Sequence, residues 1–306
     1  MKELIKKGVY PLRSSEIEEL TGLKICGKQL TQEIDHASIP TLIDEGCLIF
    51  LDNGNSCANL NEINAAKNLL VLINKNFSFE LSVPHLICEH PRQIWGTLIR
   101  ALYDYENRFV FHEDKQLQNC EIGERVRISK SAIISHNCKI GDETVIQDNV
   151  FLAPYSIIGK RCTLMTGTII GAQGFGPMRY GVSSENMPHI GGVIINDGCE
   201  LGAGNVIDAG TIFPTILASN VKTGSLVHIA HNVKVGEGTF MAARSGVSGS
   251  STIGKHCFIG AGAMIKDWVT IGDRAKVGLM SAVVKDVAKD TQVAGNPARE
   301  MTKNDP

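Results

Sequence analysis

The chain has 306 residues, of which 43% are apolar and 20% charged, a composition typical of a globular protein long enough for two domains. Its formal net charge of −2 argues against a general nucleic-acid binder, because such a protein needs a basic face. No run of about 20 apolar residues occurs, and the opening MKELIKKGVY has no apolar segment behind its lysines, so we expect neither a membrane span nor a secretory signal.

The cysteines indicate a reducing compartment. There are nine of them, an odd number, and no CxxC pair occurs, which argues against both a disulfide framework and a zinc ribbon. Reduced thiols in a cytoplasmic protein are the simplest interpretation.

Residues 1–115 predict a small α/β domain. The segment 14–23 is typical of a capped helix with Ser15 near its N-cap, and residues 62–76 suggest a helix that leads into a strand. Residues 90–106 predict a helix that starts at Pro91 and has one apolar face.

From about residue 120 the sequence has a period of six, which predicts a second domain over residues 116–287. This period fits neither an amphipathic helix nor a simple alternating strand, but it fits short strands joined by tight turns into a solenoid. Three hexads make one triangular coil in known hexapeptide folds, so residues 18 apart should stack about 4.8 Å apart. The first run of apolar positions is Ile122, Ile128, Ile134, Ile140, Ile146, Leu152, Ile158, Leu164 and Ile170.

A second run begins further on, and between the two runs Ile195, Leu201 and Ile207 follow a shifted frame. Two interruptions stand out in this region. Residues 172–192 are polar, glycine-rich and out of frame, which predicts an extruded loop, and a four-residue slip lies between Ile207 and Ile229. Function concentrates on loops that a rigid scaffold holds, although either insertion could be a plain surface loop. Residues 288–306 read as a short polar tail. The second run is Ile229, Val235, Met241, Val247, Ile253, Ile259, Ile265, Ile271, Val277 and Val283.

The candidate chemistry lies just after the slip, where His228 and His231 occur together. A neutral imidazole can take a proton from an attacking amine or hydroxyl, although a histidine on a β-helix is more often a solvated surface residue. Gly249 is 18 residues beyond His231, so the two should stack. Its bare backbone N–H could stabilise the oxyanion of an acyl transfer, or the glycine could only serve a turn.

A zinc site of the β-helical carbonic anhydrase type is the rival interpretation. His228, His231 and His256 are available, but the repeats contain no HxxxxH pair, which is part of that family's spacing, so we predict no metal. A serine or cysteine nucleophile is not favoured, because no GxSxG elbow is present.

Three motifs resemble the UDP-3-O-acylglucosamine N-acyltransferases of lipid A synthesis. They are GAQGFG at 171–176, ELGAGNVIDAG at 200–210 and IAHNVKVGEGTFMAARSGVSGS at 229–250, and the 22-residue gap between Ile207 and Ile229 is also similar. The resemblance implies a left-handed parallel β-helix, a homotrimer with sites at the subunit seams, no tightly bound cofactor, and acyl-CoA or acyl carrier protein as co-substrate.

The resemblance also implies roles for single residues. His231 matches the general base and Gly249 the oxyanion position, with Asp208 as our candidate to support the base. In the N-terminal domain CLIFLDNGN is similar to the segment that holds uracil, so Phe50 would stack on the base and Asn53 would hydrogen-bond it. Further residues expected to bind the nucleotide sugar are Gly174, Phe175, Gly176 and His228, and those expected to bind the acyl donor are Lys266 and Arg299.

Several positions depart from that family. Gly224 stands where an acidic residue often precedes the base, Trp268 replaces a second histidine, and Ala209 replaces an arginine. Pro177 follows GFG, and Ser56 stands where a tyrosine is expected. The ending AGNPAR at 294–299 looks like that of coenzyme A-dependent hexapeptide acetyltransferases.

We therefore predict an N-acyltransferase that moves an acyl group from a thioester to the amino group of a nucleotide-linked sugar, for surface polysaccharide or lipopolysaccharide synthesis. The alternatives are the standard lipid A enzyme and a non-catalytic β-helix protein that binds nucleotide sugars.

Overall fold

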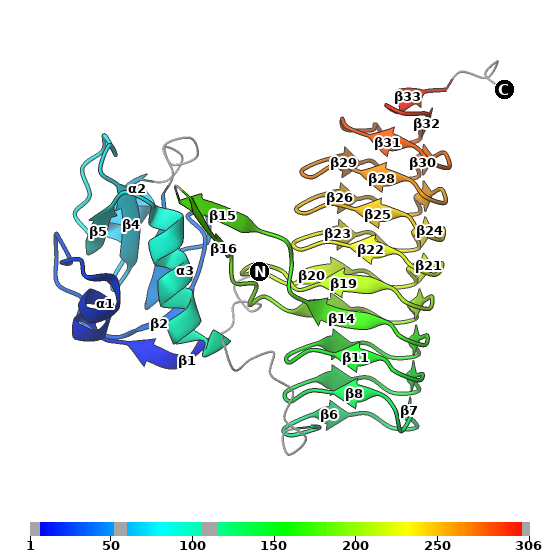
Figure 1. Cartoon of the computed structure of the whole chain (residues 1–306), viewed down its shortest axis with the longest axis horizontal. Helices are drawn as coiled ribbons and strands as arrows, with labels where there is room; N and C mark the ends of the chain where they lie inside the picture. The colour runs from blue at the N-terminus through cyan, green and yellow to red at the C-terminus, as the bar shows by residue number, and fades with distance from the viewer. Residues whose placement is uncertain (1–6, 52–59, 106–115, 181, 302–306) are drawn as a thin grey trace. The chain divides into compact units, whose positions relative to one another are not determined.

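The computed structural model of the chain describes residues 7–51, 60–105, 116–180 and 182–301. The chain divides into two compact units, one formed by residues 1–110 and 176–190 and the other by residues 111–175 and 191–306 (Figure 1). Asn53 and Ser56 lie outside the described residues.

The first unit is a five-stranded sheet with three helices. The sheet order follows the chain, and only the pairing of its first two strands is antiparallel. The predicted helices in 14–23 and 90–106 and the predicted helix-then-strand in 62–76 are confirmed. The elements are β1 (Lys7–Leu12), α1 (Ser14–Thr21), β2 (Ile34–Ala37), β3 (Cys47–Phe50), α2 (Leu60–Ala65), β4 (Leu70–Asn74), β5 (His85–Cys88) and α3 (Pro91–Leu102).

The ends of these helices follow from local side chains. The N-cap of α1 is Arg13 rather than Ser15, because the Glu16 carboxylate accepts the Arg13 backbone N–H at 2.8 Å. Pro91 opens α3, where its missing N–H costs no helical hydrogen bond. The inner face of α3 buries Trp95, Leu98, Ile99 and Leu102.

The extruded segment predicted at 172–192 forms a β-hairpin, with β15 (Pro177–Tyr180) antiparallel to β16 (Ser183–Asn186). By its contacts the hairpin belongs to the first unit. Arg100 of α3 donates a hydrogen bond to the Asn186 carbonyl at 2.9 Å, and Met178 is buried.

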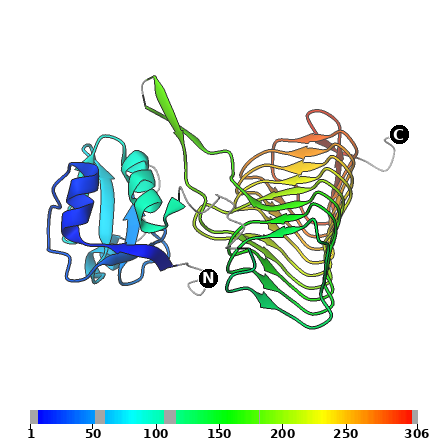
Figure 2. The same cartoon turned by 60° about the horizontal axis from the view of Figure 1, so that its bottom comes forward.

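The second unit is a parallel β-solenoid of hexapeptide coils, as predicted, and Figure 2 shows the coils stacked in register. Each coil contributes one strand to each of three sheets.

Sheet 1 contains β6 (Glu121–Ile122), β9 (Lys139–Ile140), β12 (Ile157–Ile158), β17 (Val193–Ile195), β20 (Thr215–Leu217), β23 (Lys234–Val235), β26 (Thr252–Ile253) and β29 (Thr270–Ile271).

Sheet 2 contains β7 (Arg127–Ile128), β10 (Val145–Ile146), β13 (Thr163–Leu164), β18 (Glu200–Leu201), β21 (Lys222–Thr223), β24 (Phe240–Met241), β27 (Phe258–Ile259), β30 (Lys276–Val277), β32 (Gln292–Ala294) and β33 (Arg299–Glu300).

Sheet 3 contains β8 (Ile133–Ile134), β11 (Phe151–Leu152), β14 (Ile169–Ala172), β19 (Val206–Asp208), β22 (His228–Ile229), β25 (Gly246–Val247), β28 (Met264–Ile265) and β31 (Ala282–Val283).

The strand register confirms the predicted stacking. Most partners are 18 residues apart, as in the pairing of Ile229 with Val247. The hairpin insertion lengthens the spacing between Ile170 and Ile207 to 37 residues, and the slip lengthens that between Ile207 and Ile229 to 22. Neither insertion breaks a sheet, because the extra residues leave at a corner. The repeated apolar residues form one continuous core from Ile134 onward. In the first coil Ile128 is partly buried against this core, and Ile122 is exposed.

The corners explain the period of six. Almost every corner holds one residue with positive φ, among them Tyr155, Leu226, Asn232 and Trp268. None of the non-glycine residues in this conformation is Val, Ile or Thr, because branching at Cβ makes a positive φ too costly.

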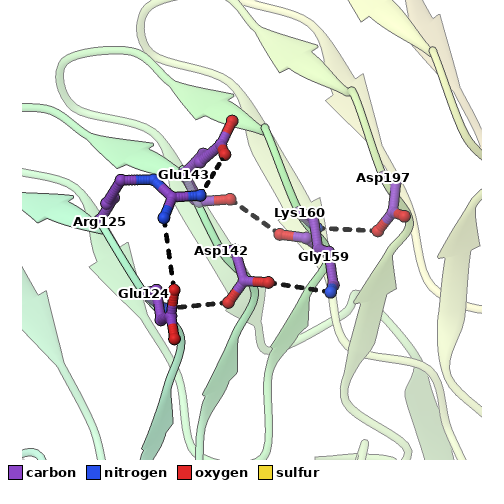
Figure 3. Close-up of polar contacts among 8 residues, drawn as sticks. Glu124, Arg125, Asp142, Glu143, Gly159, Lys160 and Asp197 are labelled. Atoms are coloured by element: carbon purple, nitrogen blue, oxygen red, sulfur yellow. Dashed lines mark hydrogen bonds and ion pairs between the residues drawn. The ribbon is translucent and has the colours of Figure 1, made fainter.

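Charged side chains join successive coils at the corner between sheets 1 and 2 (Figure 3). Asp142 accepts the backbone N–H of Glu124 at 2.9 Å and pairs with Lys160 at 2.9 Å, while Arg125 pairs with Glu143 at 2.5 Å. Asp197 repeats the arrangement one coil on by accepting the Lys160 N–H at 2.8 Å. These carboxylates satisfy corner amides that no strand partner reaches.

The predicted polar tail begins with ordered structure. Its strand β32 pairs with β30 and extends sheet 2 beyond the last full coil, and β33 pairs back on β32. The apolar Val293 is buried there.

Candidate active site

Both interruptions of the repeat and the predicted catalytic pair, His231 and Gly249, lie along one corner of the β-helix. We call it the site edge, the corner at which each sheet 3 strand turns into the next sheet 1 strand. The hairpin insertion lies there between β14 and β17, the slip between β19 and β20, and His231 between β22 and β23. Gly249 follows β25 on the next coil, and β14, β19, β22 and β25 are stacked in Figure 1.

His231 and Gly249 lie against each other, as the 18-residue spacing predicted. A Cβ atom placed on Gly249 would lie 2.6 Å from His231 Cε1 and 2.7 Å from Nε2, so the ring occupies the space of a side chain. The backbone of Gly249 does not have a positive φ, so this contact, and not the turn, is what requires glycine. No residue in the described part of the chain accepts a hydrogen bond from the Gly249 N–H.

The surroundings of His231 favour a neutral ring. Burial lowers the pKa of His231, and the nearby His228 acts in the same direction, whereas Asp208 and a hydrogen bond to the Phe175 carbonyl oppose the shift. A neutral imidazole at neutral pH is the form that a general base requires. The Nδ1 atom of the ring is 3.0 Å from Nδ2 of Asn232.

Asp208 contacts the other histidine directly. Its carboxylate is buried and lies 3.1 Å from Nε2 of His228, whose side chain is half exposed on the outer face of sheet 3. This hydrogen bond raises the pKa of His228, against the opposing effect of partial burial. The direct hydrogen-bond partner of Asp208 is therefore His228, and its influence on His231 is through charge.

The slip residues 209–214 form a loop segment beside His231. Their backbone is tied to the base of the hairpin insertion, because Ala209 donates to the Ala172 carbonyl at 2.8 Å and Gly191 donates to the Gly210 carbonyl at 2.7 Å. A Cβ on Gly210 would lie 1.7 Å from the Phe213 carbonyl oxygen, so only glycine allows this close approach. The hairpin insertion and the slip residues are thus joined by backbone hydrogen bonds, although they are separate in the sequence.

The GFG motif reaches the same place through its backbone. Gly174 is buried, the side chain of Phe175 is 80% exposed, and the Phe175 carbonyl contacts the His231 ring. A Cβ on Gly176 would lie 3.2 Å from Cβ of Met187. An exposed aromatic ring beside the base is available to contact a ligand.

The remaining predicted residues are spread over the chain. Lys266 follows β28 on the site edge, one coil beyond Gly249, and lies 3.9 Å from Asp267. Arg299 belongs to β33 at the end of sheet 2, so this chain does not bring it to the site edge. His256 lies at the corner between sheets 1 and 2, so the three histidines of the zinc interpretation do not converge.

Phe50 belongs to the first unit, at the end of β3. Its ring meets Trp95 edge-on at 5.9 Å between centroids, and the Arg92 guanidinium lies 5.7 Å from its centre. Arg92 and Trp95 were not predicted as site residues. The sequence predicts the helix 90–106 and its apolar face, but nothing in the sequence indicates that this face contacts Phe50.

Asn232 and Thr211 were also missed. Thr211 donates its backbone N–H to Oδ1 of Asn232 at 2.7 Å, which anchors the slip residues to the coil of His231. Asn232 directly follows the predicted base in IAHN, and its positive φ is a position that asparagine tolerates. An asparagine at a corner position directly after the predicted base is the sequence feature that could have identified Asn232 as a site residue.

Two features of the described residues bear on rival functions. No group of three or more His, Cys, Asp or Glu side chains there could hold a metal ion. None of the helices described is long and apolar enough to cross a membrane.

Comparison with known proteins identifies the class of fold. The model of the bacterial transferase hexapeptide (six repeats) matches residues 119–153 and 250–278. Among solved structures, a UDP-N-acetylglucosamine acyltransferase from Campylobacter jejuni superposes with a TM-score of 0.55 at 22% identity, over 62% of this chain and 73% of that one. The enzyme of the same name from Bacteroides fragilis gives 0.54 at 22%, over 63% and 74%. The second unit therefore has the hexapeptide-repeat β-helix fold.

Among curated proteins, the relatives are more specific. Proteins named UDP-3-O-acylglucosamine N-acyltransferase match from Caulobacter sp. strain K31, at 34% identity over 49% of this chain and 44% of that one, and from Herminiimonas arsenicoxydans, at 37% over 53% and 46%. The protein of this name from Hahella chejuensis is 37% identical over 47% and 42%. The predicted resemblance is thus confirmed, and the match spans less than half the length of these relatives.

Proposed function

We propose that this chain is an N-acyltransferase that transfers an acyl group from a thioester to the amino group of a UDP-linked glucosamine derivative. The observation that carries the proposal is the contact between His231 and Gly249, a neutral imidazole packed against a bare glycine on the next coil. The names of the curated relatives supply the acceptor class.

The reaction needs a general base and a donor for the oxyanion, and the site edge offers both. His231 accepts the proton of the sugar amine as the nitrogen attacks the thioester carbonyl. The N–H of Gly249 donates a hydrogen bond to the developing oxyanion. The tetrahedral intermediate then collapses, the C–S bond breaks, and the proton on the base goes to the leaving thiolate. No covalent enzyme intermediate is required.

The proposal assigns acceptor binding to the residues predicted from the sequence. Phe50, backed by Trp95 and Arg92, offers an aromatic face for the base of the nucleotide, and Asn53 would hydrogen-bond its edge. Gly174, Phe175, Gly176 and His228 would then hold the sugar near His231. The proposal includes a cytoplasmic homotrimer, as the resemblance implies.

Two donors are compatible with the residues at the far end of the site edge. Trp268 is 77% exposed where the related enzymes have a second histidine, and AGNPAR resembles the ending of coenzyme A-dependent enzymes. These departures favour a short acyl-coenzyme A bound near Lys266, whereas the resemblance to the lipid A enzymes favours acyl carrier protein. Arg299, the other residue predicted to bind the donor, lies away from the site edge in this chain.

The test is a substrate panel with product mass as the readout. UDP- and dTDP-linked amino sugars, including UDP-3-O-acylglucosamine, are incubated with short-chain acyl-coenzyme A or with a long-chain acyl carrier protein thioester. An N-acylated sugar supports the proposal, and the active donor distinguishes the altered enzyme from the standard lipid A enzyme. Tight binding of the nucleotide sugar without turnover by any donor would instead indicate a binding protein.

The panel also tests the base. His231→Ala should lower kcat/KM by about 10²–10⁴ if the imidazole accepts the proton in the transition state. His256→Ala is the matched control, because it removes an exposed corner histidine away from the site edge. Full activity of the His231 variant would remove this residue from the role.

A further inference from the structure

The orientation of the Asn232 amide is fixed by a backbone donor. The Thr211 N–H can only donate, and it lies 2.7 Å from one side-chain atom of Asn232, which must therefore be the oxygen Oδ1. The other atom, Nδ2, lies 3.0 Å from Oγ1 of Thr211 and 3.5 Å from Oγ of Ser250, both hydroxyls that can accept. The same Nδ2 faces Nδ1 of His231 at 3.0 Å.

An amide NH₂ can only donate, so Nδ1 of His231 must accept. A neutral imidazole has one nitrogen that accepts and one that carries the proton, which places the proton of His231 on Nε2. The ring also has a hydrogen bond to the Phe175 carbonyl, and a carbonyl oxygen can be met only by an N–H, so this contact is compatible with a proton on Nε2. The tautomer itself follows from the Asn232 amide.

We infer that Asn232 is a positioning residue that holds neutral His231 in the tautomer with its proton on Nε2. The edge of the ring formed by Cε1 and Nε2 faces Gly249, where the oxyanion would form, and Nδ1 is closed by Asn232. The Nε2 lone pair is therefore not available in the resting site. It becomes available only when the proton leaves Nε2 and the ring moves away from the Asn232 amide, because Nδ1 cannot carry the proton while the amide NH₂ faces it. This catalytic consequence, unlike the tautomer itself, rests on the proposed function.

The isosteric change Asn232→Asp reverses the direction of the hydrogen bond between residue 232 and Nδ1 of His231, because a carboxylate accepts where the amide NH₂ donates. Oδ1 of an aspartate still accepts the Thr211 N–H, the two hydroxyls can rotate to donate, and aspartate tolerates a positive φ. The second carboxylate oxygen accepts a proton from Nδ1, which leaves the lone pair on Nε2. The negative charge also raises the pKa of His231. The other charged groups that face the ring, Asp208 and His228, are unchanged.

The direct experiment is a long-range ¹H–¹⁵N correlation of protein labelled at histidine, with His231→Gln to assign the signals. We expect a protonated Nε2 in the wild type and a protonated Nδ1 in Asn232→Asp. The control is Asn220→Asp, which makes the same change at an exposed corner residue of similar φ on another edge. A protonated Nδ1 in the wild type overturns the inference, and this result does not depend on any variant folding.

The kinetic experiment uses whichever substrates the panel identifies. The acid limb of kcat/KM should move to higher pH in Asn232→Asp, because the base must be neutral and its pKa is raised. Asn220→Asp should leave the limb in place. An unmoved limb despite an exchanged tautomer would overturn the catalytic role of Asn232. Absence of turnover with every substrate, together with the expected spectrum, would contradict the proposed function and leave the tautomer assignment standing.

Discussion

Gly249 lies so close to the His231 ring that any side chain at this position must displace it. Gly249→Ala places a methyl group 2.6 Å from Cε1, so the ring has to move by about an ångström, which can cost about 10²-fold in rate. Overpacking of this kind costs about 1–3 kcal/mol of stability, so the variant should still fold. The measurement is kcat/KM beside a thermal unfolding curve.

Gly246→Ala is the control for that change. Gly246 is in strand β25, just before Gly249, and a Cβ there would meet the flexible end of Met264 at 2.7 Å and make ordinary contact with the His228 carbonyl at 3.9 Å. Its activity should stay near that of the wild type. Equal activity of the two alanine variants would show that the ring position is not set by Gly249.

His228 should make the stability of the fold depend on pH. Its pKa is raised above the ordinary 6.5 by the Asp208 carboxylate, so the folded state holds the proton more tightly than the unfolded state. The ion pair therefore contributes fully below about pH 6.5, and its contribution is lost as pH rises through the raised pKa.

The variant His228→Gln isolates this contribution, because it keeps a donor for Asp208 and removes the charge. The difference in free energy of unfolding between wild type and variant should be larger at about pH 5.5 than at about pH 8. His231 is present in both proteins, but part of its lowered pKa comes from His228, so the substitution also relieves that part and works against the expected difference at low pH. A difference that is constant or grows with pH would show that the pair is not ionic.

At the scale of elements, the slip residues 209–214 show how an insertion becomes part of a site. They are hydrogen-bonded to the base of the hairpin insertion on one side and to Asn232 on the other. Gly210→Ala cannot keep this arrangement, because its Cβ would overlap the Phe213 carbonyl oxygen. We expect a loss of about 1–3 kcal/mol and a loss of the Thr211–Asn232 hydrogen bond.

Hydrogen exchange of the Thr211 amide measures this effect locally. Its protection should fall in Gly210→Ala, while the amides of the coils around Val247 and Ile253 keep theirs. Undiminished protection at Thr211 would mean that the segment can rearrange without releasing Asn232.

The elements of the β-helix were predictable because each depends on local chemistry. An apolar residue every sixth position fixes the strands, and the 18-residue coil fixes which residues stack, so His231 against Gly249 followed from counting alone. The handedness of the coil and the trimer stay predictions from the resemblance.

The supporting contacts were not predictable, because they depend on insertions that leave the repeat. Nothing in the period of six says that Thr211 meets Asn232, or that Asp208 meets His228 directly. The hairpin likewise reads only as polar and out of frame, since its short strands have little apolar alternation.

At the scale of the whole molecule, the residues that the structure describes include two hydrophobic clusters that share no residue. One is the column of hexapeptide residues inside the β-helix, and the other contains Leu69, Val71 and Ile73 with their neighbours in the first unit. The β-helix gains stability coil by coil from nearest neighbours, whereas the first unit depends on one small sheet. We therefore expect two transitions in calorimetry, each governed by its own core.

Matched core truncations assign the transitions. Ile49→Ala in β3 and Ile253→Ala in β26 each remove a fully buried side chain at a cost of about 2–5 kcal/mol. Ile49→Ala should lower only the transition temperature of the first unit, and Ile253→Ala only that of the β-helix, because a cavity destabilises the residues that pack directly around it. If both variants shifted a single shared transition by similar amounts, the units would unfold as one cooperative body, and binding of the nucleotide sugar to the first unit would then stabilise the β-helix as well.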